Sequence, residues 1–92
     1  MIKSFRHKGL EAFYKTGSLA DIQAKHAKRL REQLTALSAA NKPDDLKRPS
    51  WRLHGLAGDR TGFFSITVQA NWRMVFRFDG TDIELVDYLD YH

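Results

Sequence analysis

The spacing of apolar residues changes near the middle of this chain, and that change constrains the fold most. In the first half, apolar side chains recur every three or four residues, the period of an amphipathic helix. From residue 63 onward they alternate with polar side chains, as in a strand with one buried face. Helices followed by strands predict an α+β fold, with the N-terminal helices packed on one face of an antiparallel sheet. At 92 residues we expect one domain, spanning residues 1–92.

The first half predicts two helices. One is expected over residues 8–15, ended by Gly17, because glycine tolerates the positive φ that follows many helices. The other is expected over about 19–39, with Ser18 as its N-cap. Its apolar stripe consists of Leu19, Ile22, His26, Leu30, Leu34 and Leu37. We interpret His26 as a packed structural histidine, because it falls on this stripe.

The second half predicts a meander of strands. A polar connection over residues 43–50, with one short helical turn, precedes them. Asp79-Gly80 and residues 58–62 have the composition of tight turns. Strands are expected over residues 2–5, 51–56, 63–69, 72–78 and 83–88. The last of these carries apolar side chains on both parities, so its register is not fixed by the pattern.

Alternation within the strands predicts which side chains share the uncovered face of the sheet. If the apolar parity faces the helices, the other parity points to solvent. It carries Arg52, His54, Phe63, Arg73 and Arg77. Guanidinium groups bind phosphates, an exposed ring such as Phe63 stacks on an unpaired base, and histidine moves protons near neutral pH. The combination suits single-stranded RNA, although any one-sided sheet has a polar face.

Charge and composition narrow the function classes further. Residues 1–52 hold 12 Lys and Arg against 5 Asp and Glu, which favours a polyanionic partner, although a basic helix can also be only a solvated face. Without cysteine, disulfides and cysteine-ligated zinc are excluded. The four histidines lack metal-ligand spacing, so we expect no metal and no cofactor. No apolar run suits a signal peptide or a membrane span, and we expect a cytoplasmic protein with no membrane partner.

The chain ends at Asp87-Tyr88-Leu89-Asp90-Tyr91-His92. If His92 is the terminal residue, its own α-carboxylate is a neighbouring anion and favours the imidazolium form. A frayed terminus without function is the alternative reading.

Several segments, taken in order, resemble the HigB toxins of the RelE superfamily, from bacterial toxin–antitoxin pairs. The similarity covers nearly the whole chain. The segments that carry it are Met1-Ile2-Lys3-Ser4-Phe5, Leu53-His54-Gly55-Leu56-Ala57-Gly58-Asp59-Arg60, Gly62, Ser65-Ile66, Val68, Asn71-Trp72-Arg73 and Asp90-Tyr91-His92. The resemblance implies a compact α+β domain with an antiparallel sheet, and metal-independent cleavage of mRNA on the translating ribosome.

The resemblance also implies residue roles. His54 corresponds to a catalytic histidine, and Asp90, Tyr91 and His92 correspond to a terminal Asp-Tyr-His group. Asn71 and Arg73 correspond to a segment that contacts RNA or holds charge. With the ribose 2′-OH as the internal nucleophile, His54 and His92 become the acid–base candidates, in an order that the sequence leaves open.

One departure from the family pattern concerns the scissile phosphate. Where the family often carries a lysine, this chain has Ala57, and Gly55 stands in place of a proline. Either Arg60 or Arg73 supplies the cation instead, or this protein is a slower enzyme. We favour Arg73, because strand parity places it on the face that carries His54.

The resemblance implies partners as well. They are a helix-turn-helix antitoxin (HigA-like), which alone would contact operator DNA, and the ribosome with its mRNA. An exposed apolar patch on helix 19–39 is our first expectation for the antitoxin surface. The alternatives are a non-catalytic RNA-binding module, a ParE-like toxin that inhibits DNA gyrase, and a purely structural partner-binding domain.

Overall fold

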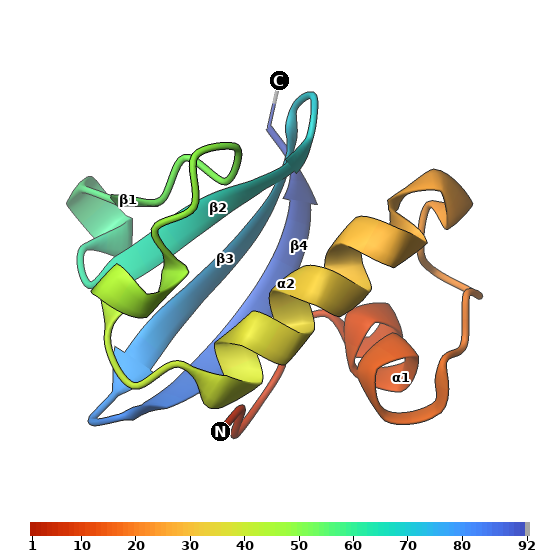
Figure 1. Cartoon of the computed structure of the whole chain (residues 1–92), viewed down its shortest axis with the longest axis horizontal. Helices are drawn as coiled ribbons and strands as arrows, with labels where there is room; N and C mark the ends of the chain where they lie inside the picture. The colour runs from red at the N-terminus through yellow and green to blue at the C-terminus, as the bar shows by residue number, and fades with distance from the viewer. Residues whose placement is uncertain (92) are drawn as a thin grey trace.

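A four-stranded antiparallel sheet, with helices on one of its faces, makes up the computed structural model, which describes residues 1–91 (Figure 1). The strands are β1 (His54–Gly55), β2 (Phe63–Gln69), β3 (Trp72–Asp79) and β4 (Asp82–Asp90), and they lie side by side in that order. The helices are α1 (Lys8–Thr16) and α2 (Ala27–Ala39), with 3-10 turns η1 (Ala24–His26), η2 (Pro43–Leu46) and η3 (Gly58–Arg60). Within residues 1–91, none of the helices has the length and apolarity needed to cross a membrane.

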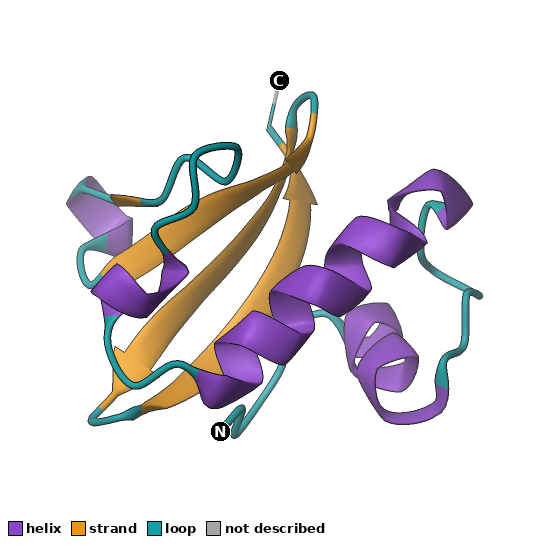
Figure 2. Ribbon diagram, in the orientation of Figure 1, coloured by secondary structure: helices purple, strands orange, loops and turns teal. Residues whose placement is uncertain are grey.

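The core lies between α2 and the face of the sheet that α2 crosses (Figures 1 and 2). Leu30, Leu34 and Leu37 of α2 are buried there. Strands β2 and β3 contribute the apolar parity that the sequence predicts, including Ile66, Met74 and Phe76, and β4 adds Ile83 and Val86. Both the α+β class and the one-sided packing of helices on the sheet are therefore confirmed.

Two tight hairpins fix how the long strands meet. The β3–β4 hairpin has Gly80 at φ 63°, as the Asp79-Gly80 pair predicts. The β2–β3 hairpin turns through Ala70 and Asn71, and Ala70 takes φ 52°, a conformation that costs a non-glycine residue energy. This second hairpin brings Asn71 beside the end of β4, where the Tyr91 backbone N–H donates to the Asn71 carbonyl at 2.8 Å.

The predicted start of the second helix is wrong. Helix α2 begins at Ala27, after the short turn η1, and Ser18 does not cap it. Residues between α1 and η1 instead pass against α1, so closely that a methyl group on Gly9 would overlap Asp21. Leu19 is 46% exposed rather than part of the buried stripe. The close contact with α1 determines the backbone path here and overrides the helical spacing.

Two predicted strands are shorter than expected. Residues 2–5 form only two isolated parallel bridges with β4, from Ile2 to Ile83 and from Phe5 to Val86. Within residues 51–56, only His54–Gly55 pairs as a strand with β2. The interruption lies at Arg52, whose φ of 50° breaks the extended backbone, although the Trp51 carbonyl still accepts from the Thr67 N–H at 2.6 Å.

Strand β4 is longer than predicted and explains the ambiguous pattern in its sequence. It runs from Asp82 to Asp90 and contains an irregularity where Leu85 takes φ 57°. An extra residue reverses the alternation of side chains at that point. Apolar residues therefore occupy both parities while Ile83, Val86 and Tyr88 all reach the core.

His26 is a packed residue, as the sequence predicts. Its side chain is 1% exposed, and its Nδ1 lies 2.6 Å from the Tyr88 hydroxyl oxygen. Burial, with a smaller effect from the positive charge of Lys25, lowers the pKa of His26 below its ordinary value. Burial also raises the pKa of the Tyr88 hydroxyl. Both groups are therefore neutral in the folded protein near neutral pH.

Acid should weaken the fold through His26. Unfolded chains protonate a free histidine below about pH 6.5, whereas the lowered pKa keeps folded His26 neutral to a lower pH. Between those two pKa values the free energy of unfolding should fall, by up to about 1.4 kcal/mol per pH unit for this group. Below the folded pKa this contribution stops changing. Urea unfolding of the native protein and of His26→Gln, between pH 5 and 7.5, measures it.

The difference between the two unfolding curves isolates His26, because every other titrating group is common to both proteins. We expect the native protein to be the more stable near pH 7 and its advantage to shrink as the pH falls. A stability difference that stays constant over this range would contradict the assignment.

Candidate active site

The face of the sheet opposite α2 carries a group of the predicted functional side chains. Cross-strand pairing places His54 opposite Ser65, and Ser65 opposite Val75. The neighbouring row on the same face pairs Thr67 with Arg73. Residues two apart on one strand lie about 7 Å apart along it, so these rows are adjacent. The prediction that His54 and Arg73 share a face is confirmed.

His54 is exposed and has a defined tautomer. Its Nδ1 lies 3.2 Å from the carbonyl oxygen of Arg52. A carbonyl oxygen only accepts hydrogen bonds, so Nδ1 carries the proton in this contact and Nε2 keeps its lone pair. This arrangement suits a general base.

Tyr91 is held from two directions just after the end of β4. Its backbone donates to Asn71, and its hydroxyl accepts a hydrogen bond from Arg60 Nη1 at 2.6 Å. The Arg60 guanidinium carbon also lies 5.7 Å from the centre of the Tyr91 ring. Three predicted residues from three separate segments thus converge. Asn71 contributes its backbone carbonyl to this contact.

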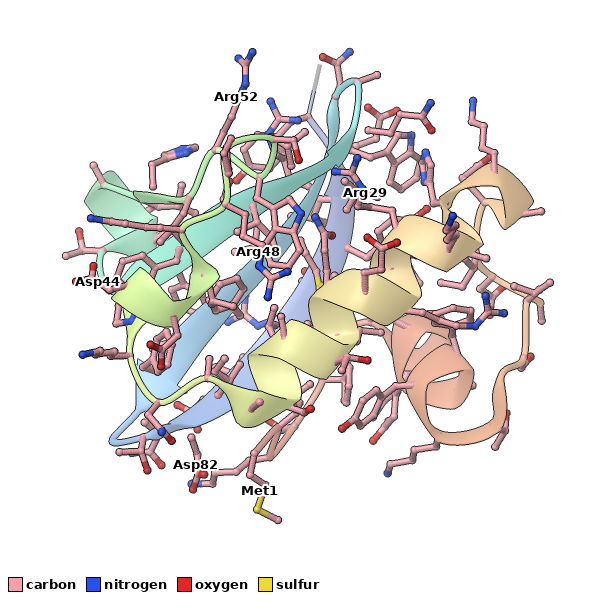
Figure 3. All side chains as sticks on the ribbon, viewed as in Figure 1. Met1, Arg29, Asp44, Arg48, Arg52 and Asp82 are labelled. Atoms are coloured by element: carbon pink, nitrogen blue, oxygen red, sulfur yellow. The ribbon has the colours of Figure 1, made fainter. Side chains whose placement is uncertain are left out.

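Arg73 and Arg52 lie at the edge of the group. Arg73 Nη1 donates to the carbonyls of Ala70 at 2.7 Å and Trp72 at 3.3 Å, so part of its guanidinium is held by the β2–β3 hairpin. Figure 3 shows the Arg52 side chain extending away from the body of the molecule. The positive φ of Arg52 ends the alternation that predicted a common direction with His54. Arg52 and Arg73 instead border one pocket at the edge of β2.

The expectation that Phe63 offers an exposed ring for stacking is wrong. Phe63 is on the predicted face but only 8% exposed, because the guanidinium groups of Arg6 and Arg77 lie 5.2 and 5.4 Å from its ring centre. Arg77 also forms an ion pair with Glu84 on β4. Arg6 is not among the residues predicted from the sequence, because its position depends on the distant pairing of Phe5 with Val86.

Two members of the predicted Asp-Tyr-His group are described. Asp90 ends β4 opposite Trp72, next to the anchored Tyr91. His92 lies outside the described residues. Among residues 1–91, no three His, Asp or Glu side chains come together as metal ligands.

Sequence comparison gives two findings that agree with this geometry. The family model described as RelE-like toxin of type II toxin-antitoxin system HigB matches residues 3–92. The chain is also 42% identical to Endoribonuclease HigB of Proteus vulgaris over 92 residues, which is the whole of both chains.

Solved structures share the fold at low sequence identity. The YoeB-YefM complex from Staphylococcus aureus contains a chain that matches with a TM-score of 0.66 and 19% identity, covering 100% of this chain and 98% of that one. The YoeB dimer from Staphylococcus aureus matches with a TM-score of 0.59 and 18% identity, covering 99% and 94% of the two chains. At such identities the similarity concerns the fold alone.

Proposed function

Because this chain belongs to the RelE-like, HigB family of toxins from type II toxin–antitoxin systems, we propose that it is an endoribonuclease. It would cut mRNA on the translating ribosome, as a single toxin domain spanning residues 1–92, and so inhibit translation and growth. The observation that carries the proposal is the tautomer of His54, which leaves a proton acceptor exposed on the face of the sheet that also carries Arg73.

The proposed reaction needs no nucleophile from the protein. His54 Nε2 removes the proton of the ribose 2′-OH, and the 2′ oxygen attacks the adjacent phosphorus. The bond from phosphorus to the 5′ oxygen breaks as the new bond forms. His92 donates a proton to the leaving 5′ oxygen. The products are a 2′,3′-cyclic phosphate and a 5′-OH, and no metal takes part.

A cation must balance the charge that develops on the phosphate. The geometry favours Arg60, because it contacts Tyr91 within the Asp-Tyr-His group, whereas Arg73 Nη1 is already shared with two backbone carbonyls. We therefore propose that Arg60 stabilises the scissile phosphate and that Arg73 holds RNA beside it. Asp90 would orient a histidine, and Tyr91 would support the substrate by stacking or hydrogen bonding.

Membership of a toxin–antitoxin family means that the chain has an antitoxin partner. We propose that this antitoxin is a HigA-like helix-turn-helix protein and that operator DNA is contacted only through it. We also propose that the toxin acts in the cytoplasm.

Cleavage on ribosomes tests the function directly. Purified protein added to a reconstituted translation system should cut the mRNA being translated, and primer extension would map the new 5′ ends. The upstream fragments should end in a 2′,3′-cyclic phosphate, which acid opens and phosphatase then removes. The same protein should leave gyrase supercoiling unchanged. Bound but intact mRNA would favour a non-catalytic RNA-binding module, and loss of supercoiling would favour a ParE-like activity.

A further inference from the structure

A basic groove lies beside the β2–β3 hairpin and the start of α2. It consists of two neighbouring pockets of about 480 and 360 Å³ that share Arg29, Val68 and Gln69. Figure 3 shows Arg29 on α2 and Arg52 on the loop before β1, both toward the hairpin end of the molecule. We call this pair of pockets the hairpin groove.

Positive charge dominates the hairpin groove. Five cationic side chains border it: Lys25, Lys28, Arg29, Arg52 and Arg73. Glu32 is the one acidic residue among those that line the two pockets. Within residues 1–91, Lys25, Lys28, Arg29 and Arg52 form no ion pair with an acid. Their charges therefore remain available to a ligand.

The placement of these cations works against the stability of α2. Lys28 and Arg29 lie in its first turn, which contains no acidic residue, and Lys25 lies just before it. The N-terminus of a helix carries a partial positive charge, so cations there are unfavourable and an anion is favoured. The backbone and the side chains therefore both contribute positive potential at the start of α2.

Two residues that line the groove have a buried polar atom. His26 lines the smaller pocket beside Gln69, whose side chain interacts with the imidazole, and the His26 Nε2 is buried. Thr67 lines the larger pocket, and its Oγ1 is buried without a hydrogen-bond partner within residues 1–91. Both pockets therefore have polar as well as cationic lining residues.

We propose that the hairpin groove binds the phosphate backbone of RNA beyond the cleavage site. The inference rests on the proposed ribonuclease function, because it takes the bound strand to be RNA. Arg73 connects the groove to the open face, since it borders the larger pocket and lies in the strand row next to that of His54. One strand could therefore follow the hairpin from the open face onto α2. Both mRNA and ribosomal RNA carry this phosphate chemistry.

Charge removal within the groove tests the proposal. The variant Lys25→Gln/Lys28→Gln/Arg29→Gln removes three charges and changes none of the proposed active-site residues. The control Lys15→Gln/Lys42→Gln/Lys47→Gln removes the same charge elsewhere. The probe is a 2′-O-methyl RNA oligonucleotide, which has no free 2′-OH and cannot be cleaved. We expect the groove variant to bind it about tenfold or more weakly, with a salt dependence flatter by about 2 in log–log slope, because three phosphates at about 0.7 each are lost. The control should change binding less than about threefold.

Two further arms complete the test. Co-sedimentation with 70S ribosomes tests whether the strand in the groove is ribosomal RNA. If the groove variant loses binding to ribosomes but not to the oligonucleotide, the strand is ribosomal RNA. The melting temperature of the groove variant should equal or exceed that of the native protein, because the substitutions remove cations from the start of α2.

Equal losses of binding for both triple variants would overturn the proposal, as would unchanged binding of the groove variant to both oligonucleotide and ribosomes. Weaker binding to the antitoxin alone would show that the groove serves an acidic protein instead. Since the oligonucleotide arm requires no cleavage, it can succeed even if the proposed ribonuclease activity fails.

Discussion

His54→Gln is expected to lower the single-turnover rate of mRNA cleavage at least about 100-fold while leaving RNA binding within about twofold. Positioned general acid–base groups contribute about 10²- to 10⁴-fold to rates, and His54 is exposed with Nε2 ready to accept a proton. Glutamine is similar in size and can keep a hydrogen bond to the Arg52 carbonyl, but it cannot take up a proton near neutral pH. Rates measured by quench-flow with saturating ribosomes separate the chemical step from binding.

A second histidine provides the matched control for this experiment. His7 caps α1, where its Nδ1 accepts from the Leu10 N–H at 2.9 Å. His7→Asn removes an imidazole but keeps a residue type that caps helices well. It should cut mRNA at the native rate. A His54→Gln protein that melts at the native temperature and still cleaves at more than about a tenth of the native rate would exclude His54 as the base.

The face of the sheet on which each residue lies could be predicted where local alternation determines it. Strands β2 and β3 carry a clear period of two, and their register places His54 and Arg73 on the uncovered face as expected. The same rule failed at Arg52, because a single backbone angle of 50° ends the alternation and no feature of the surrounding sequence indicates it. The prediction that Phe63 is exposed was wrong for a different reason. Its cover comes partly from Arg6, more than fifty residues away in the chain.

The other features that could not be predicted from the sequence depend on contacts between segments that are distant in the chain. Family resemblance pointed to Arg60 and Tyr91 separately, but the hydrogen bond between them depends on how η3 and the end of β4 are placed by the whole sheet. The hairpin groove depends in the same way on how close η1 and the start of α2 lie to the β2–β3 hairpin. Its cations were visible in the sequence as a charge excess, but their common direction was not.

Arg60 and Tyr91 should act as a coupled pair in cleavage. We expect Arg60→Gln to reduce the cleavage rate about 100- to 1000-fold, because an interaction that stabilises developing charge contributes roughly 2.7–4 kcal/mol. Tyr91→Phe should cost less, about tenfold, because it keeps the ring under the guanidinium and removes only the hydroxyl acceptor. Arg31→Gln is the matched control, since Arg31 stacks on Phe13 on the helical side of the molecule. It should change the rate less than about twofold.

The double variant distinguishes direct action from positioning. If Arg60 both stabilises the phosphate and holds Tyr91, then Arg60→Gln/Tyr91→Phe should lose less than the product of the two single losses, because the shared hydrogen bond is counted once. Arg60→Gln should nevertheless keep a loss of at least about tenfold when Tyr91 is already phenylalanine, since its charge still faces the phosphate. Losses that multiply fully would show that the contact between the two side chains has no part in catalysis. If instead Arg60→Gln has no effect in the phenylalanine background, Arg60 only positions Tyr91, and Arg73 becomes the remaining candidate for the cation that replaces the missing lysine at Ala57.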